Sequence, residues 1–200
     1  MKRLNCMFVV AVFILIMAAG SARATDLVSN GGFETIGAYL GNGVYAPTGW
    51  TLVDTSGASG VYNSTAYGLS AHSGQNFLWA GAYGGAIGTL SQALTTTSGQ
   101  AYSLDFWLTN AGDVPNSFSA AWNGTELLEL TNVFDRSPYT QYTYLVTGTG
   151  SDALTFTFNQ EPTGWGLDDV SVNSVPEPTS LLLLGFGLVG LVGARKKFKK

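Results

Sequence analysis

The sequence has 200 residues, of which 13 are acidic and 9 are basic, and its formal net charge is −4 at pH 7. Eight of the basic residues lie near the two ends, so residues 25–174 contain one basic side chain, Arg136, against 12 acidic ones, a formal charge of −11. Such a segment is repelled by the phosphates of nucleic acids and by anionic lipid surfaces, which excludes nucleic-acid binding.

The N-terminal residues have the pattern of a secretory signal peptide. Residues 2–3 are basic, residues 4–19 are almost entirely apolar, and the small residues Ala22 and Ala24 precede a cleavage point. This three-part pattern predicts that residues 1–24 direct export and are then removed. A retained N-terminal anchor is the alternative.

Residues 25–174 have the composition of one all-β domain. The segment of about 150 residues is long enough to bury a core. It is rich in Gly, Ser, Thr and aromatic residues and lacks a sustained helical stripe. Alternating apolar and polar residues, together with the hairpin signal Asn123-Gly124, predict an antiparallel β-sandwich of eight or nine strands. The predicted strands include 26–28, 49–53, 77–80, 89–94, 101–108, 142–146, 153–158 and 165–172, and the Gly-rich segments 37–47 and 57–74 are predicted to be surface loops.

Five short motifs of this segment follow one another in an order known from other sandwiches. They are LVSNGGFE at 27–34, GW at 49–50, AHSG at 71–74, QAYSLDFW at 100–107 and GLDDVSV at 166–172. In this order they resemble galactose-binding-like jelly rolls, which include the carbohydrate-binding modules of many bacterial glycosidases. The resemblance implies a jelly-roll fold over residues 26–172, whereas fold analogy alone does not establish sugar binding.

The last predicted strand contains a candidate buried carboxylate. If Val170 and Val172 face the core, strand alternation places Asp168 on the same inward face and Asp169 on the outward face. A buried carboxylate needs a partner, and the segment offers only one arginine. Calcium is another partner, because carboxylates and the backbone carbonyls of Gly-rich turns such as 30–32 are its preferred ligands.

The resemblance to jelly rolls also implies where a calcium ion would lie. In such sandwiches a structural calcium often joins the first loop to the last strand. The resemblance assigns this role to Glu34 and Asp168, with help from the backbone near Asn30. The alternative is that both carboxylates accept hydrogen bonds from backbone N–H groups or from Trp50.

Aromatic side chains in the predicted loops are the candidate ligand-binding residues. Sugar-binding sandwiches stack sugar rings on exposed Trp or Tyr and bind the hydroxyls with Asn, Asp or Gln. Trp107 and Trp122 lie within predicted strands, so we expect them to belong to the core or to a sheet face. The candidates in or beside predicted loops are Trp79, Tyr83, Tyr62 and Tyr67, with Tyr39 and Tyr45 as further members of the set.

The sequence lacks the residue sets of common catalytic sites. His72 is the only histidine, and Ser73 beside it points the other way in an extended chain. The only cysteine, Cys6, lies in the predicted signal peptide, so thiolate chemistry, disulfides and zinc sites are not expected. Alternation places Glu126 and Glu129 on opposite faces of their strand, and likewise Asp168 and Asp169. Neither pair is therefore expected to converge on a substrate. The sequence predicts a protein without enzymatic activity.

The last 26 residues, 175–200, consist of three zones. The hinge Pro176-Glu177-Pro178 precedes an uncharged apolar run over 180–194, and five of the final six residues are basic. The run would make a helix about 22 Å long, which is short for a bilayer core but can be extended by snorkelling side chains. The pattern predicts a transmembrane helix over 180–194 with a cytoplasmic C-terminus.

This tail resembles the PEP-CTERM sorting signal of Gram-negative bacteria, in which a Pro-Glu-Pro triplet, a short apolar helix and a basic end occur in this order. The resemblance implies export by the secretion machinery, transient anchoring in the inner membrane, and cleavage by an exosortase near Pro176, Glu177 and Pro178. It also implies delivery to the cell envelope or to extracellular polysaccharide. The alternative is an ordinary single-span anchor with a chance triplet.

Three hypotheses for the function remain open on the sequence. The first is an exported, non-catalytic β-sandwich that binds or lies within extracellular polysaccharide. The second is a purely structural surface or matrix component that binds no specific glycan. The third is a glycan-active enzyme, which the scarcity of gathered reactive groups disfavours.

Overall fold

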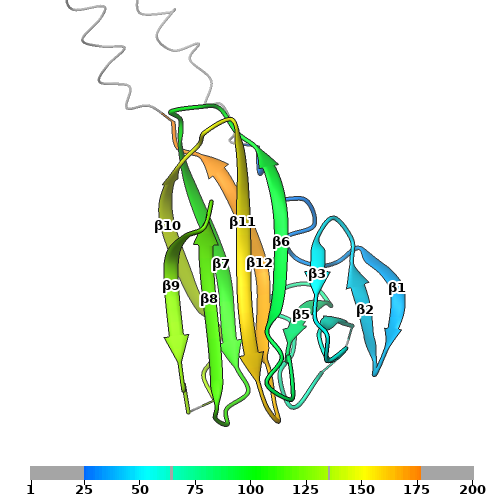
Figure 1. Ribbon diagram of the computed structural model, residues 1–200. Coiled ribbons are helices and arrows are strands. Elements are labelled where there is room, and N and C mark those ends of the chain that lie inside the picture. Colours follow the sequence, from blue (N-terminus) through cyan, green and yellow to red (C-terminus); the bar gives the residue numbers. More distant parts are fainter. Residues whose placement is uncertain (1–24, 64, 135, 177–200) are drawn as a thin grey trace, which may run out of the picture. The chain divides into compact units, whose positions relative to one another are not determined.

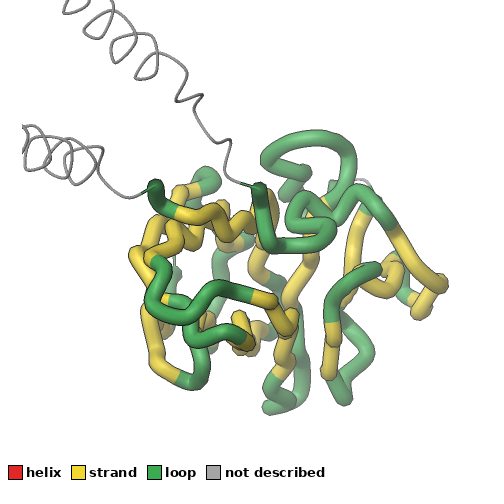
Figure 2. The backbone as a smooth tube through the Cα atoms, turned by 90° about the horizontal axis from the view of Figure 1, so that it is seen from above, coloured by secondary structure: helices red, strands yellow, loops and turns green. Residues whose placement is uncertain are grey.

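The structure is a computed structural model, and it describes residues 25–63, 65–134 and 136–176. Thr25–Val175 forms one compact unit, and its described residues form strands and loops only (Figure 1, Figure 2). The predicted signal peptide and the predicted helix over 180–194 lie outside the described residues. Within the described ranges, no helix is long and apolar enough to cross a membrane. The strands are β1 (Ile36–Gly41), β2 (Val44–Pro47), β3 (Thr51–Val53), β4 (Gly60–Tyr62), β5 (Phe77–Ala80), β6 (Gly88–Thr95), β7 (Ala101–Asn110), β8 (Asn116–Trp122), β9 (Thr125–Thr131), β10 (Thr140–Thr147), β11 (Ser151–Gln160) and β12 (Trp165–Ser174).

The strands form two antiparallel sheets. One has seven strands in the order β1-β2-β4-β5-β12-β7-β10, and the other has five in the order β3-β6-β11-β8-β9. In the view of Figure 1, β8, β11 and β6 of the five-stranded sheet pass in front of β7 and β12. The prediction of an all-β antiparallel sandwich is confirmed.

The core lies between the two sheets because the side chains of each long strand alternate between its faces. In β7 every second residue from Tyr102 to Leu108 is buried. Phe106 of the seven-stranded sheet meets Phe118 and Phe156 of the five-stranded sheet, with ring centroids 6.5 Å and 5.2 Å away. Burial of such large apolar rings is the main favourable contribution to the stability of the sandwich.

The segment predicted as a loop over 37–47 is a hairpin made of β1 and β2. Its turn residues Asn42 and Gly43 have positive φ angles of 52° and 83°, as a type I′ turn requires. Tyr39 and Tyr45 are register partners across the hairpin, and their ring centroids are 5.3 Å apart. The second predicted loop also contains a strand, β4. The loop prediction is therefore wrong at these strands, because a Gly-rich composition obscured an Asn-Gly turn and a cross-strand aromatic pair.

The first described residues run alongside β12. The Leu27 N–H donates to the Val172 carbonyl at 2.9 Å, and the Val170 N–H donates to the Gly31 carbonyl at 3.0 Å. The predicted first strand is therefore not a regular strand, but its backbone pairs with the last strand of the sandwich. This pairing places the first loop beside the C-terminal half of β12.

A β-bulge in β12 corrects the predicted orientation of its carboxylate. Asp168 pairs with Trp107 of β7, whereas Ser171 pairs with Asp105, so three steps along β12 oppose two steps along β7. The extra residue places Asp168 on the outer face of the sheet, opposite the face that buries Val172. Asp168 is fully buried as predicted, but loop residues cover it on the outer face, and it does not lie in the core.

A second buried carboxylate, Asp152, joins three turns at one end of the sandwich. It accepts hydrogen bonds from the side chains of Thr96 and Asn123 and from both the N–H and the hydroxyl of Thr149, the latter two at 2.9 and 2.8 Å. Burial alone would raise the pKa of Asp152, but these hydrogen bonds outweigh it and lower the pKa to about 2.

Replacing Asp152 by asparagine is expected to destabilise the domain by about 1–3 kcal/mol at pH 7, because an amide cannot accept all four hydrogen bonds. Because the pKa of Asp152 is lowered in the folded state, its charged form stabilises the fold at pH values above the pKa of the unfolded chain. This stability is lost as the pH falls through about 2. Urea unfolding at pH 7 and pH 2 should therefore show a large difference between wild type and variant only at pH 7. Glu129→Gln, at an exposed position of β9, is the matched control. Equal stabilities of Asp152→Asn and wild type at pH 7 would contradict this role.

Candidate functional site

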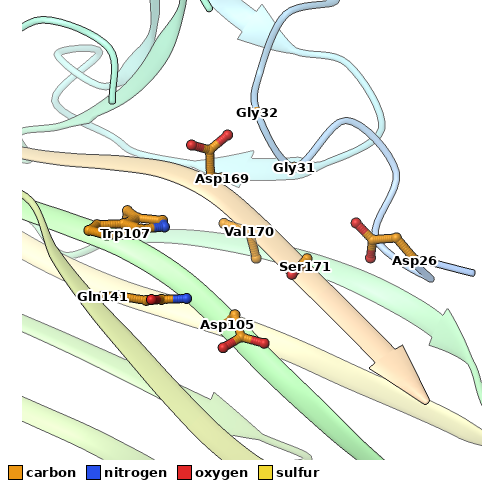
Figure 3. Close-up of a pocket in the computed structure, with 9 residues that line it drawn as sticks. All are labelled: Asp26, Gly31, Gly32, Asp105, Trp107, Gln141, Asp169, Val170 and Ser171. Carbon is orange, nitrogen blue, oxygen red and sulfur yellow. The ribbon is translucent and has the colours of Figure 1, made fainter. Parts of the chain in front are cut away.

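The outer face of the seven-stranded sheet carries a groove of about 520 Å³, here called the Trp107 groove (Figure 3). Three strands and the first loop contribute to it. Its residues are Asp26, Gly31 and Gly32 from the first loop, Asp105 and Trp107 from β7, Gln141 from β10, and Asp169, Val170 and Ser171 from β12.

The strand register gathers these side chains on one face. Gln141 is the register partner of Trp107, and Ser171 is the partner of Asp105. Register partners in an antiparallel sheet point to the same side, so these polar side chains surround the indole. Figure 3 shows Trp107 lying between Asp169 and Gln141, with Asp105 farther along the groove.

His72 closes one side of this groove. Its ring stacks on the indole of Trp107 with centroids 3.9 Å apart and an interplanar angle of 17°. Its Nδ1 lies 2.6 Å from the Asp169 carboxylate, and the Ser73 hydroxyl donates to the other oxygen of Asp169 at 2.7 Å. The Ser73 hydroxyl therefore serves Asp169, and these three residues do not form a nucleophilic triad.

Asp168 holds the loop that carries His72 on the sheet. Its Oδ2 accepts the backbone N–H groups of His72 at 2.8 Å and Ser73 at 3.2 Å, and its Oδ1 accepts the N–H of Asp169 at 2.8 Å. Burial raises the pKa of Asp168 to about 7, and the charge of Asp169 adds to this shift while the backbone hydrogen bonds oppose it.

Glu34 holds the other end of the same loop. Its Oε1 accepts the backbone N–H groups of Gln75 at 2.9 Å and Asn76 at 3.0 Å. Gly74 has a φ of +63°, and a Cβ at this position would collide with the same carboxylate. Glycine is therefore required where the loop passes over Glu34.

The predicted calcium ligands fit the structure in part. A Cβ built on Gly32 would lie 4.0 Å from Asp168 Oδ1 and 3.4 Å from Asp169 Oδ1, so two carboxylates lie beside this glycine, whereas only the Cγ of Glu34 approaches it, at 4.0 Å. Asn30 does not fit, because its carbonyl accepts the Trp50 indole N–H at 3.1 Å. In the described part of the chain, no three His, Cys, Asp or Glu side chains are arranged to hold a metal ion. Calcium there would need backbone carbonyls to complete its shell.

The predicted aromatic site forms a cluster around Trp79. The Trp79 ring is 1% exposed, stacks on Tyr67 at 4.9 Å and meets the edge of Tyr62 at 6.0 Å. A Cβ on Gly164 would lie 2.5 Å from the same indole. The prediction that Trp79 offers a ring to a ligand is therefore wrong, because its surface is covered. Tyr67 is 57% exposed, whereas Tyr62 is partly buried.

Tyr83 is a less suitable ligand contact than Tyr67. It is partly buried, and this burial raises the pKa of its hydroxyl to about 12. Trp107 is expected from its strand position to belong to the core or to a sheet face, and strand alternation places it on the same face as Ser103 and Asp105. These polar neighbours on the same face are the sequence signal for an indole on an open face of the sheet.

The carboxylate pair on β9 also differs from its prediction. The register between β8 and β9 shifts by one residue between Ala120 and Ala121 of β8, and this bulge leaves Leu127 of β9 unpaired. Glu126 and Glu129 consequently lie on the same exposed face rather than on opposite faces. Neither residue lines the two cavities found on the seven-stranded sheet.

Replacing Asp168 by asparagine is expected to change the pH dependence of stability in calcium-free buffer. Because the pKa is raised from 3.8 to about 7, the folded protein holds one proton more than the unfolded chain between these values. Stability should fall with rising pH in this window, by up to about 1.4 kcal/mol per pH unit. Urea unfolding from pH 5 to 7 should show this slope in the wild type and in the exposed control Asp113→Asn. The same slope in Asp168→Asn would contradict the assignment.

Calcium is expected to raise the melting temperature of the protein. A cation held by Asp168 and Asp169, with Glu34 as the third predicted ligand, would relieve the repulsion between these carboxylates, and binding to the folded state alone stabilises it in proportion to the logarithm of the ligand concentration. Differential scanning fluorimetry in calcium and in EDTA should differ by several degrees for wild type and not for Glu34→Gln. If EDTA leaves the wild-type melting temperature unchanged, the carboxylates act only as acceptors for the loop N–H groups.

Comparison with known proteins supports two features of the chain. Residues 174–197 match the PEP-CTERM protein-sorting motif, and proteins with this motif are exported, processed by exosortase and sorted to the cell surface. A search of curated proteins gives no match.

Several solved structures share the sandwich. The module TmCBM61, in complex with β-1,4-galactotriose, is 18% identical, with a TM-score of 0.55 over 76% of this chain and 99% of its own. A cyclase from Fischerella sp. TAU is 20% identical, with a TM-score of 0.55 over 78% of this chain and 100% of its own. The K3 adhesin domain of Lys-gingipain from Porphyromonas gingivalis W83 is 17% identical, with a TM-score of 0.52 over 75% and 98%. At these identities the likeness concerns the fold alone. The chain therefore carries a PEP-CTERM sorting motif and a β-sandwich similar in fold to carbohydrate-binding modules.

Proposed function

We propose that this protein is an exported, exosortase-processed surface protein whose β-sandwich binds a polysaccharide in the Trp107 groove without catalysing a reaction. Cleavage near Pro176, Glu177 and Pro178 would release the sandwich from the inner membrane to the cell envelope or to extracellular polysaccharide. The sorting motif over 174–197 supports the export part of this proposal.

The position of Trp107 on an open sheet face carries the binding part of the proposal. Its indole lines a groove of about 520 Å³ together with Asp105, Gln141 and Asp169. A sugar presents apolar C–H groups that favour contact with an aromatic ring, and hydroxyls that favour carboxylates and amides. Stacking by His72 at 3.9 Å keeps the indole in one orientation, which lowers the entropy lost on binding.

The chemistry of the groove favours binding over catalysis. The carboxylate with the strongly raised pKa, Asp168, is fully buried, and backbone N–H groups bind both of its oxygens. Asp169, which lines the groove, already binds His72 and Ser73. A glycoside hydrolase needs two carboxyl groups that reach the same bond from opposite sides, and these two do not.

A binding experiment on the full chain tests this function. Screening on a glycan array, followed by isothermal titration with the retained glycan, should give a measurable affinity for wild type. Trp107→Ala should weaken it about tenfold or more, equivalent to about 1.4 kcal/mol of lost contact. Gln141→Ala, at an exposed position of β10, should weaken it by a smaller factor without affecting stability.

Tyr39→Ala is the matched control, because Tyr39 is 62% exposed on β1 and does not line the groove. It should bind as tightly as the wild type. If the array retains no glycan, the purely structural hypothesis is preferred. Binding that survives in both Trp107→Ala and Gln141→Ala would refute the groove as the site.

A further inference from the structure

A second cavity of about 330 Å³, here called the Arg136 cavity, lies on the same outer face as the Trp107 groove. It is lined by Gly68, Leu69, Ser70, Thr109, Arg136, Ser137, Pro138 and Tyr139. Thr109 follows Trp107 by two residues on β7, so the two sites succeed one another along this strand. His72 separates them, because its ring stacks on Trp107 and meets the ring of Tyr139 at 5.3 Å.

Arg136 is held at this cavity by one backbone carbonyl. Its Nη2 donates to the Tyr67 carbonyl at 2.6 Å. A Cβ on Gly68 would lie 2.5 Å from Nη1, and Gly68 has a φ of +79°, so the chain provides the space that the guanidinium occupies. Among the described residues, no carboxylate lies within 4.0 Å of this guanidinium. A guanidinium carries five N–H donors, and one of them is used in this contact.

Tyr67, whose backbone carbonyl binds this cation, also has an exposed aromatic ring. The inner face of its ring stacks on the buried Trp79 at 4.9 Å and an interplanar angle of 17°, while the side chain remains 57% exposed. The stacking fixes the ring, and the same residue supplies the carbonyl that binds Arg136. The Arg136 guanidinium and the exposed hydroxyl-bearing residue Ser70 line this cavity, and Tyr67 directly precedes Gly68, another of its lining residues.

We propose that the Arg136 cavity binds an acidic sugar, a hexuronate unit, whose carboxylate pairs with Arg136 and whose ring packs on Tyr67. A guanidinium matches a carboxylate through two parallel hydrogen bonds. Arg136 is the single basic residue of a segment with a formal charge of −11, so a densely charged polyanion such as a nucleic acid is disfavoured. This inference rests on the proposed function and names the class of glycan that the same sheet face selects.

Comparing an acidic glycan with its neutral counterpart tests the inference. The probes are oligogalacturonate, oligomannuronate and oligoglucuronate, each paired with its carboxyl-reduced form of the same linkage and length, titrated into the full chain. The wild type should bind at least one acidic form about tenfold more tightly than its reduced form, because only the acidic form offers a carboxylate to Arg136. Arg136→Gln should abolish the preference, and Arg136→Lys should retain part of it.

Two variants separate the possible outcomes. Tyr67→Ala should weaken both forms, and Trp107→Ala should weaken both forms without changing their ratio. Equal affinity of wild type for acidic and reduced forms, or a preference that survives Arg136→Gln, overturns the uronate assignment while leaving the proposed function intact. If neither form of any probe binds, the uronate assignment fails, and retention of another glycan on the array decides the proposed function separately. Unchanged melting temperatures of the Arg136 variants confirm that they are folded.

Discussion

The arrangement of the outer sheet face depends on one carboxylate, Asp168, and the backbone N–H groups that it binds. Two of these N–H groups belong to His72 and Ser73, so the carboxylate fixes the 71–74 loop on β12. Removing this carboxylate from water raises its pKa to about 7. The raised pKa reflects the free-energy cost of keeping the group charged while it is buried at the contact. Because the loop is fixed there, His72 lies on Trp107, and the face is divided into the Trp107 groove and the Arg136 cavity.

The bulge in β12 makes this contact compatible with a well-packed core. In a regular strand Asp168 and Val172 would share a face. Either the carboxylate would then lie among the aromatic rings of the core, or the valine would leave it, and both arrangements are unfavourable. One extra residue between the pairs Asp168–Trp107 and Ser171–Asp105 lets the strand bury Val172 inward and Asp168 outward. The first loop then pairs with the bulged half of the strand.

Sequence patterns predicted the regular part of this structure and missed the irregular part. Alternation identified the long strands, because the burial of every second side chain is a property of the chain itself. A bulge adds one residue without a sequence signature, so the burial of Asp168 was predicted on the wrong face. The same limit affected the aromatic residues. The loops beside Trp79 suggest exposure, although in β5 it stacks on Tyr67 and is buried, whereas the strand position of Trp107 suggests packing, although it lines an open groove.

The selection of a ligand by this fold depends on contacts at short range. Sandwiches of similar fold occur in a module in complex with galactotriose, a cyclase and an adhesin domain, so the strands alone do not determine the ligand. The formal charge of −11 on residues 25–174 opposes the approach of acidic chains, but salt screens such repulsion beyond about 10 Å at 0.1 M ionic strength. On the uronate proposal, the guanidinium of Arg136 would outweigh this screened field at contact distance, because it would form a charge-assisted hydrogen bond with the ligand directly. On this proposal, one positioned cation in an acidic domain would favour a glycan that contains hexuronate units over its neutral counterpart.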